Sequence, residues 1–383
     1  MIPLSPQLVP ATFHGRGDVP SILDRPHKLF LTAGRMAFAL GLRLAGVKAG
    51  DEVLLPAYAS GSMVTPILLQ GATPVFYRLR RDLAADLDDL AGRITSRSAA
   101  LLGVNFFGFA QDWAALRAFA DRFGLLLVED CAHALYGAWR GQPLGSFGDF
   151  AIASLTKFLP VWDGGLLALN ALPAPRVATR APSLRTELKS VYNLLEEAKD
   201  HGRNPVLRPL LAALERRRQQ TRRSNSPAAA GESLRRDVTG AVDPARILDA
   251  PAAVSRFVAR RAARPRIAER RRQAYALYQE GLAGVPSCAM PFQPTADEVP
   301  FMVPVWVDDL DRWHPRWLER GLPMQRFAEY LWPDLPADTC PVARDLSRHL
   351  VQFPCHQDLE LAEIRSIIET IRTDLSSARR AAS

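Results

Sequence analysis

The sequence predicts an α/β protein built on a parallel sheet with helices on both faces. Between residues 28 and 170, short apolar runs alternate with stretches of helical periodicity, and this alternation is typical of a covered parallel sheet. Of the 383 residues, 48% are hydrophobic and 23% are charged, as in ordinary globular domains. The four cysteines are scattered without a CxxC pair, so the sequence indicates neither a zinc site nor a disulfide framework.

The boundaries of these elements follow from the residues that end them. Asp112 precedes a helical stretch and Gly124 follows it, as expected for a helix start and stop. Pro56 ends one apolar run, and Gly71 closes the helix after it. The predicted helices are 32–44, 62–70 and 112–123, and the predicted strands are 52–55, 74–77, 99–106, 125–128, 150–154 and 166–169.

Two units are expected: a large domain over residues 1–243 and a smaller one over 244–383. The last part of the large domain, 173–243, is atypical, because it consists of helical stretches rich in Leu, Arg and Glu that prolines interrupt. In the small domain we expect a long helix over 252–282 that is interrupted near Pro265. A strand over 301–307 and helices over 311–320 and 360–375 complete it.

The formal net charge is +8, and arginines are concentrated at 216–223 and 260–272. Such runs can bind nucleic acid, anionic lipid or a phosphorylated substrate, although a solvated helix face is the simpler interpretation. Aromatic residues do not interleave with these arginines, so no nucleic-acid partner is expected. No apolar run is long enough to span a bilayer, and residues 1–10 lack the pattern of a signal peptide. We therefore expect a cytoplasmic protein without membrane insertion.

Lys157 indicates the chemistry. It lies in the run Ser154 to Pro160, where apolar neighbours disfavour the ammonium form. Asp130 and His133 follow an apolar strand, and ligands of parallel sheets gather at such carboxyl ends. An amine can form a Schiff base with an aldehyde cofactor, and a carboxylate can keep a pyridine nitrogen protonated. Alone, each residue also fits a surface lysine or a strand-end turn, but together they predict pyridoxal 5′-phosphate (PLP) as cofactor.

Further residues fit a site for this cofactor. Gly34 and Arg35 open a predicted helix, whose N–H groups and guanidinium suit a phosphate. Ser154 could add a hydroxyl. His133 and Tyr58 are candidates to pack against the ring, with a buried structural histidine and a core tyrosine as the alternatives.

Six segments, in order along the chain, resemble those of the DegT/StrS-type sugar aminotransferases, which have a type I PLP fold. The resemblance covers about 29–170 and 266–372. The segments are GVKAGDEVLLPA (46–57), GATPVF (71–76), VEDCAHALYG (128–137), GSFGDF (145–150), CPVARDLS (340–347) and FPCHQDL (353–359).

The resemblance implies a mostly parallel seven-stranded sheet with helices on both faces and a smaller α/β C-terminal domain. Lys157 would form the Schiff base, Asp130 would contact the pyridine nitrogen, and His133 would replace a ring-neighbouring glutamine. The family moves an amino group from glutamate or a similar donor to a keto sugar, typically linked to a nucleotide, and a homodimer is expected. Ile152 stands where the family places a serine. The segment 173–243 matches poorly, although its Arg216–Arg223 cluster could bind a diphosphate.

Two alternatives remain open. The acceptor could be a keto-cyclitol or another small ketone, because the residues that suit the cofactor do not select a sugar. The chain could also be a non-catalytic regulator on the same fold. The presence of Lys157 argues against a regulator, which would not need the amine.

Overall fold

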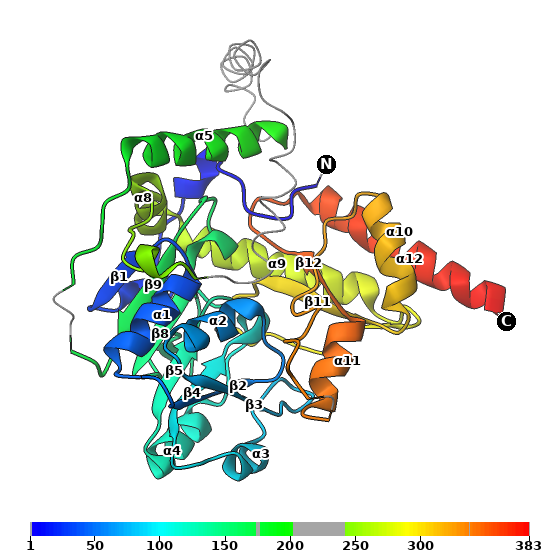
Figure 1. The fold of residues 1–383 in the computed structure, drawn as a ribbon. Coiled ribbons are helices and arrows are strands. Elements are labelled where there is room, and N and C mark those ends of the chain that lie inside the picture. The colour runs from blue at the N-terminus through cyan, green and yellow to red at the C-terminus, as the bar shows by residue number, and fades with distance from the viewer. Residues whose placement is uncertain (1, 174–176, 202–241, 337, 383) are drawn as a thin grey trace, which may run out of the picture.

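A seven-stranded sheet lies at the centre of the computed structural model, which describes residues 2–173, 177–201, 242–336 and 338–382 (Figure 1). Its strand order is β1-β9-β8-β5-β4-β2-β3. β9 pairs antiparallel with β8 and with β1, and the other pairs are parallel, so the sheet is mostly parallel as predicted. The strands are β1 (Lys28–Leu31), β2 (Glu52–Pro56), β3 (Thr73–Tyr77), β4 (Ser98–Val104), β5 (Leu126–Asp130), β8 (Phe150–Ser154) and β9 (Gly165–Leu169).

Helices cover both faces of this sheet, and the strand register shows which side chains face them. Phe150 of β8 packs against Gly41 of α1, where a Cβ would lie 2.4 Å from the phenyl ring. Across the register from Phe150, side chains on the same face belong to Val128 and Leu102. The next residue of β4, Gly103, faces the other way and meets Trp113 of α4. The helices are α1 (Gly34–Leu44), α2 (Gly61–Leu69), α3 (Leu87–Gly92) and α4 (Trp113–Phe123).

Local chemistry accounts for these boundaries. The Asp112 carboxylate accepts the N–H of Ala115 at 3.1 Å and caps α4, and Gly124 ends it with a left-handed φ of 64°. The strand predicted to reach Phe106 ends at Val104 instead. The chain turns there into a short 3-10 helix, η3 (Phe106–Gly108), in which Phe107 has a positive φ of 58°.

The C-terminal part has its own three-stranded antiparallel sheet, in the order β10-β11-β12. The predicted long helix is broken as expected: α8 ends at Arg261, and α9 starts at Arg264 with Pro265 in its first turn. Gly281 of α9 lets the C-terminal helix α12 approach closely, since a Cβ there would lie 2.6 Å from Ile368. The elements are α8 (Ala253–Arg261), α9 (Arg264–Leu282), β10 (Cys288–Ala289), β11 (Met302–Val307), α10 (Leu310–Glu319), α11 (Pro341–His349), β12 (Leu350–Pro354) and α12 (Leu361–Ala382).

Two hydrophobic clusters form the core, one around the large sheet and one around β11, β12 and α12. Ile267 and Ala268 of α9 belong to the first, whereas Ala274 and Tyr278 of the same helix belong to the second. Helix α9 therefore joins the two cores, and the domain boundary at residue 243 stays a prediction. In the atypical segment, α5 (Leu184–Asp200) is a helix as expected, and Arg216–Arg223 lies outside the described residues.

Candidate active site

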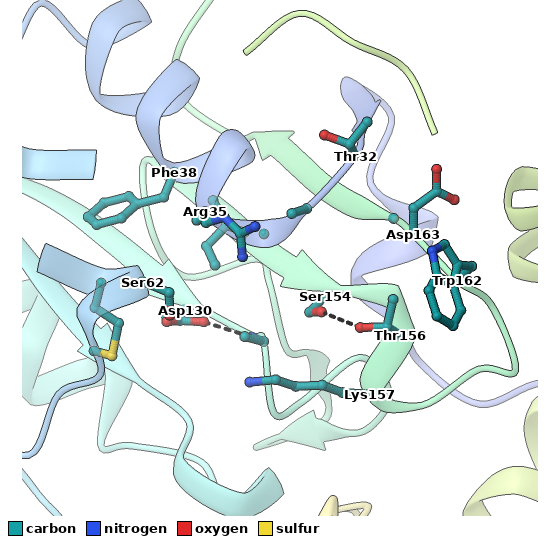
Figure 2. Close-up of a pocket in the computed structure, with 16 residues that line it drawn as sticks. Thr32, Arg35, Phe38, Ser62, Asp130, Ser154, Thr156, Lys157, Trp162 and Asp163 are labelled. Carbon is teal, nitrogen blue, oxygen red and sulfur yellow. Dashed lines mark hydrogen bonds between the residues drawn. The ribbon is translucent and has the colours of Figure 1, made fainter. Parts of the chain in front are cut away.

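A cavity of about 380 Å³ opens at the carboxyl ends of β5 and β8, beside the start of α1. Five of the seven predicted site residues line it. Figure 2 shows Arg35, Asp130 and Lys157 around the same space, each delivered by a different element. The predicted residues in the lining are Gly34, Arg35, Asp130, Ser154 and Lys157.

Lys157 ends a short 3-10 helix, η4 (Leu155–Lys157), that directly follows β8. Leu155 is fully buried, and its N–H donates to the Gly164 carbonyl at 2.9 Å, which ties the two sides of this loop together. The Nζ of Lys157 lies 5.5 Å from the centre of the Phe301 ring. The amine is therefore held over an aromatic face at the wall of the cavity.

Asp130 is the last residue of β5 and is only 6% exposed. Burial raises the pKa of its carboxyl group, while a 2.7 Å hydrogen bond from the Ala132 N–H and the charge of Lys157 oppose this. A cationic group in the cavity would favour the ionised form further. The structure thus places a buried acid where it can hold a protonated ring nitrogen.

Glu129 shows why Asp130 and not its neighbour serves the cavity. As expected for consecutive strand residues, the Glu129 side chain takes the other face of the sheet. It is fully buried there and accepts the N–H groups of Gly145 and Phe147 at 2.7 and 2.8 Å. Glu129 therefore braces the loop before β8, and the cavity receives one carboxylate from this strand end.

The start of α1, where the sequence predicts an anion site, borders the cavity. The first N–H groups of an α-helix have no carbonyl of a preceding turn to bond, and the helix dipole adds positive potential. Gly34 lies so close to β8 that a Cβ would be 3.3 Å from the Ala153 carbonyl oxygen. A Cβ on Gly34 would also lie 3.7 Å from the Ser154 Cβ, so Ser154 borders the helix start. The hydroxyl groups of Ser154 and Thr156 lie 3.2 Å apart (Figure 2). Ile152, which stands where the family places a serine, also lines the cavity.

The loop after Lys157 contributes residues that the sequence did not single out as ligands. Trp162 and Asp163 line the cavity, and the Trp162 side chain is 51% exposed. The Asp163 carboxylate accepts the N–H of Ala252 at 3.0 Å and the hydroxyl of Ser255, which anchors the loop to the start of α8. The only signal in the sequence was the run Asp163-Gly164-Gly165.

His133 and Tyr58 do not line the cavity. The His133 ring stacks on Phe301 at 4.7 Å, and its Nδ1 accepts the N–H of Phe107 at 3.3 Å. The Tyr58 side chain is fully buried, and its hydroxyl donates to the Phe327 carbonyl at 2.8 Å. Both rings pack against Phe327 in an aromatic cluster next to the residues that line the cavity. Their predicted roles in packing against a cofactor ring stay predictions.

The sheet order, the buried strand-end acid and the lysine beside a helix start define a type I fold of the PLP-dependent enzymes. The chain belongs to the DegT/DnrJ/EryC1/StrS aminotransferase family, because the model of that family matches residues 19–217, just over half of the chain. Both the predicted family and the predicted fold class are confirmed.

Several curated relatives share part or most of the sequence. GDP-perosamine synthase from Vibrio cholerae is 32% identical over 40% of this chain and 43% of its own length. A dTDP-4-dehydro-2,3,6-trideoxy-D-glucose 4-aminotransferase from Saccharopolyspora spinosa is 27% identical over 91% of this chain and 84% of its own length. The alignments with the first group of curated relatives span less than half of those proteins.

The fold is also similar to solved structures over its whole length. The apo form of a putative sugar aminotransferase from Streptococcus pneumoniae covers 100% of this chain and 99% of its own, with a TM-score of 0.68 and 19% identity. Its PLP form gives a TM-score of 0.67. At this level of identity the similarity establishes the fold.

Proposed function

We propose that the protein is a PLP-dependent aminotransferase. The observation that supports this best is the convergence of Lys157 and Asp130 on one cavity at the start of α1. The set fits the cofactor in each of its parts: an amine for the aldehyde, a buried acid for the ring nitrogen and a helix start for the phosphate. When bound, PLP supplies an electron-accepting ring that stabilises negative charge at the α-carbon of the amino donor.

The residues of the chain then have separate tasks. Lys157 would hold the aldehyde of the cofactor, and its amine would move the proton at the α-carbon of the donor. Asp130 would keep the ring nitrogen protonated. The backbone of Gly34, the Arg35 guanidinium and the hydroxyl groups of Ser154 and Thr156 would bind the phosphate. Because Lys157 serves both as anchor and as proton carrier, its loss should be severe.

For the acceptor we propose a keto sugar, with a nucleotide-linked sugar as the leading class and glutamate or a similar amino acid as donor. Relatives named as aminotransferases of UDP- and dTDP-linked sugars, together with the GDP-perosamine synthase, support this class. A spore coat polysaccharide protein from Bacillus subtilis, 34% identical over 40% of this chain, points to polysaccharide assembly as a setting. The exposed indole of Trp162 offers a flat face that suits a sugar ring or a base.

A keto-cyclitol acceptor is the second candidate. An L-glutamine:2-deoxy-scyllo-inosose aminotransferase from Streptomyces kanamyceticus is 32% identical over 42% of this chain. A non-catalytic regulator is disfavoured by Lys157, which not only is present but lines the cavity.

We also propose a homodimer, as the family resemblance implies. The outer face of α5 supports it, since Leu184, Leu188 and Val191 are 74%, 63% and 40% exposed and lie on one helix face. The cytoplasm remains the expected compartment, and nucleic acid is not expected as a partner. Among the described residues, no helix is both long and apolar enough to cross a membrane.

An absorbance spectrum of the PLP-loaded protein tests this function. We expect a visible band that borohydride abolishes and that glutamate shifts. The Lys157→Ala protein should lack the covalent linkage and lose transamination by about a thousandfold or more. Lys189→Ala, which removes an exposed lysine of α5, is the matched control and should behave as wild type. A Lys157→Ala protein that transaminates at the wild-type rate would rule out the assignment.

Nucleotide-linked keto sugars and keto-cyclitols should then be compared as acceptors with the same loaded protein. Turnover of the first class alone supports the leading proposal, and turnover of the second alone supports the alternative.

A further inference from the structure

Arg271 is a fully buried arginine in the middle of α9. Its guanidinium donates to Gln357 Oε1 at 3.1 Å and to the carbonyls of Pro300 and Phe301 at 3.1 and 2.8 Å. A further N–H donates to the main-chain carbonyl of Lys157 at 3.2 Å. An arginine of the C-terminal part of the chain thus contacts the backbone of the proposed catalytic residue.

Burying a guanidinium is unfavourable unless its charge and its N–H groups are compensated. Asp358 does not provide a direct ion pair, because it pairs with Arg266 at 2.9 Å. Carbonyl oxygens, an amide oxygen and the Phe158 ring, whose centre lies 4.3 Å from the guanidinium carbon, surround Arg271 instead. Its planar fork of donors is therefore used to hold several backbone groups at fixed positions.

Gln357 completes the arrangement. It is 2% exposed and lies in the segment 353–359 that resembles a family signature. Its Nε2 donates to the Phe158 carbonyl at 3.0 Å, while its Oε1 accepts from Arg271. The two consecutive carbonyls of Lys157 and Phe158 are thus each held by one member of a hydrogen-bonded pair.

The same guanidinium also fixes the surface beside the amine. It binds the Phe301 carbonyl, and the Phe301 ring lies 5.5 Å from the Nζ of Lys157 and stacks on His133. The Arg271 guanidinium therefore holds both the backbone of Lys157 and the residue whose ring lies next to the Lys157 amine.

We propose that Arg271 and Gln357 are positioning residues that set the place of the Lys157 amine relative to Asp130. The inference rests on the proposed role of Lys157 in PLP chemistry. A catalytic group displaced by about 1 Å can lose about a hundredfold in rate, so a fixed backbone matters even for a long side chain. Through Gln357, the segment 353–359 would contribute to a site whose catalytic lysine is far away in the sequence.

The variants are Arg271→Met, Arg271→Lys, Gln357→Leu and the double variant Arg271→Met/Gln357→Leu. Arg270→Met is the matched control, since Arg270 lies on the same helix, has an exposed part and donates to the Leu359 carbonyl instead. Gln357→Leu and Arg271→Lys keep the proposal testable if Arg271→Met does not fold.

The first readout is hydrogen exchange of the peptide around residues 155–160 in the cofactor-free protein. We expect faster exchange in Arg271→Met and Gln357→Leu, and wild-type exchange in Arg270→Met. This measurement does not depend on transamination, so it reports on local opening of the backbone around Lys157 whether or not the protein is active.

The second readout is the pH titration of the visible band of the PLP-loaded protein, together with the single-turnover rate with glutamate. In Arg271→Met the loss of a nearby positive charge should raise the titration midpoint, and the rate should fall about tenfold to a hundredfold. Arg271→Lys should recover part of the rate. The effects of Arg271→Met and Gln357→Leu should be less than additive in the double variant.

Variants that lose thermal stability but keep the wild-type midpoint and rate would overturn the positioning role and leave only a structural one. A wild-type protein without a visible band would instead contradict the proposed function, so the two failures can be told apart.

Discussion

Asp130 and Glu129 are adjacent carboxylates whose environments give them different tasks. Asp130 faces the cavity with Lys157, whereas Glu129 accepts backbone N–H groups on the other face of the sheet. Alternation along one strand thus separates a residue that we propose serves the chemistry from one that braces the structure. Substitutions that remove only the charge can test this separation.

We expect Asp130→Asn to lower the transamination rate by about a hundredfold or more, because an amide cannot stabilise a protonated ring nitrogen by charge. Its stability should change little, since Asn can still accept the Ala132 N–H. Glu129→Gln should do the reverse and lose about 1–3 kcal/mol of unfolding free energy with a nearly normal rate. Steady-state kinetics and urea unfolding measure both. Equal kinetic losses in the two variants would contradict the division of tasks.

We expect His133 to make the stability of the protein sensitive to acid. Burial, with the charge of Lys157, lowers the pKa of His133 well below its usual value. In the unfolded chain the ring takes up a proton near pH 6.5, while in the folded chain it stays neutral. The unfolded state thus binds more protons below about pH 6.5, so the stabilisation is complete above that pH and is lost as the pH falls.

Urea unfolding of the cofactor-free protein at pH 7.5 and 5.5 tests this. We expect the difference between the two pH values to shrink in His133→Asn, which keeps an acceptor for the Phe107 N–H but does not titrate. His14→Asn, which removes an exposed imidazole, is the control and should retain the wild-type difference. An unchanged difference in His133→Asn would show that other groups cause the acid sensitivity.

At the scale of the elements, the junction between α1 and β9 forms one wall of the cavity. Gly165, at the start of β9, approaches the turn before α1 so closely that a Cβ would lie 2.1 Å from the Ala33 carbonyl carbon. The antiparallel strand β9 therefore needs glycine at this position to support the helix start. This is the physical role of the second glycine in the Asp163-Gly164-Gly165 run.

We expect Gly165→Ala to lower the unfolding free energy by about 1–3 kcal/mol through overpacking and to weaken PLP binding by shifting the start of α1. Gly92→Ala is the matched control, because a Cβ at this last residue of α3 has no atom within 4 Å. It should leave both properties unchanged or stabilise slightly. Urea unfolding and PLP titration measure the two effects, and similar behaviour of both variants would exclude the packing argument.

At the scale of the whole molecule, helix α9 takes part in both hydrophobic clusters and carries Arg271 to the back of the site. In Figure 1 this helix runs from the large sheet to the C-terminal part of the chain. The proposed site therefore depends on the packing of segments far apart in sequence. The proposed homodimer would contain two such sites, one in each copy of the chain.

The dimer has a direct test. Sedimentation at micromolar concentration should give a species of about twice the chain mass of 42.2 kDa, with no dependence on bound PLP. A monomer that transaminates at the full rate would contradict the proposal.

The helices and strands could be predicted from the sequence, because each depends on local periodicity and on residues that start or end it. The strands at 52–55 and 150–154, the helix capped by Asp112 and the break near Pro265 were all predicted correctly, to within a residue or two. The conformation of Phe107 could not be predicted in this way, because its positive φ arises where the chain turns out of the sheet.

The same distinction applies to the site. The sequence alone determined the α/β class, the family and the pairing of a lysine with a strand-end acid. Local periodicity, six short segments in order and the rule that parallel strands end at one edge are enough for these. Only the tertiary structure decided that Tyr58 and His133 lie behind the wall, that Trp162 lies at the cavity and that Arg271 holds the Lys157 carbonyl. These contacts join residues up to 269 positions apart, and such distances are set by how side chains pack in three dimensions.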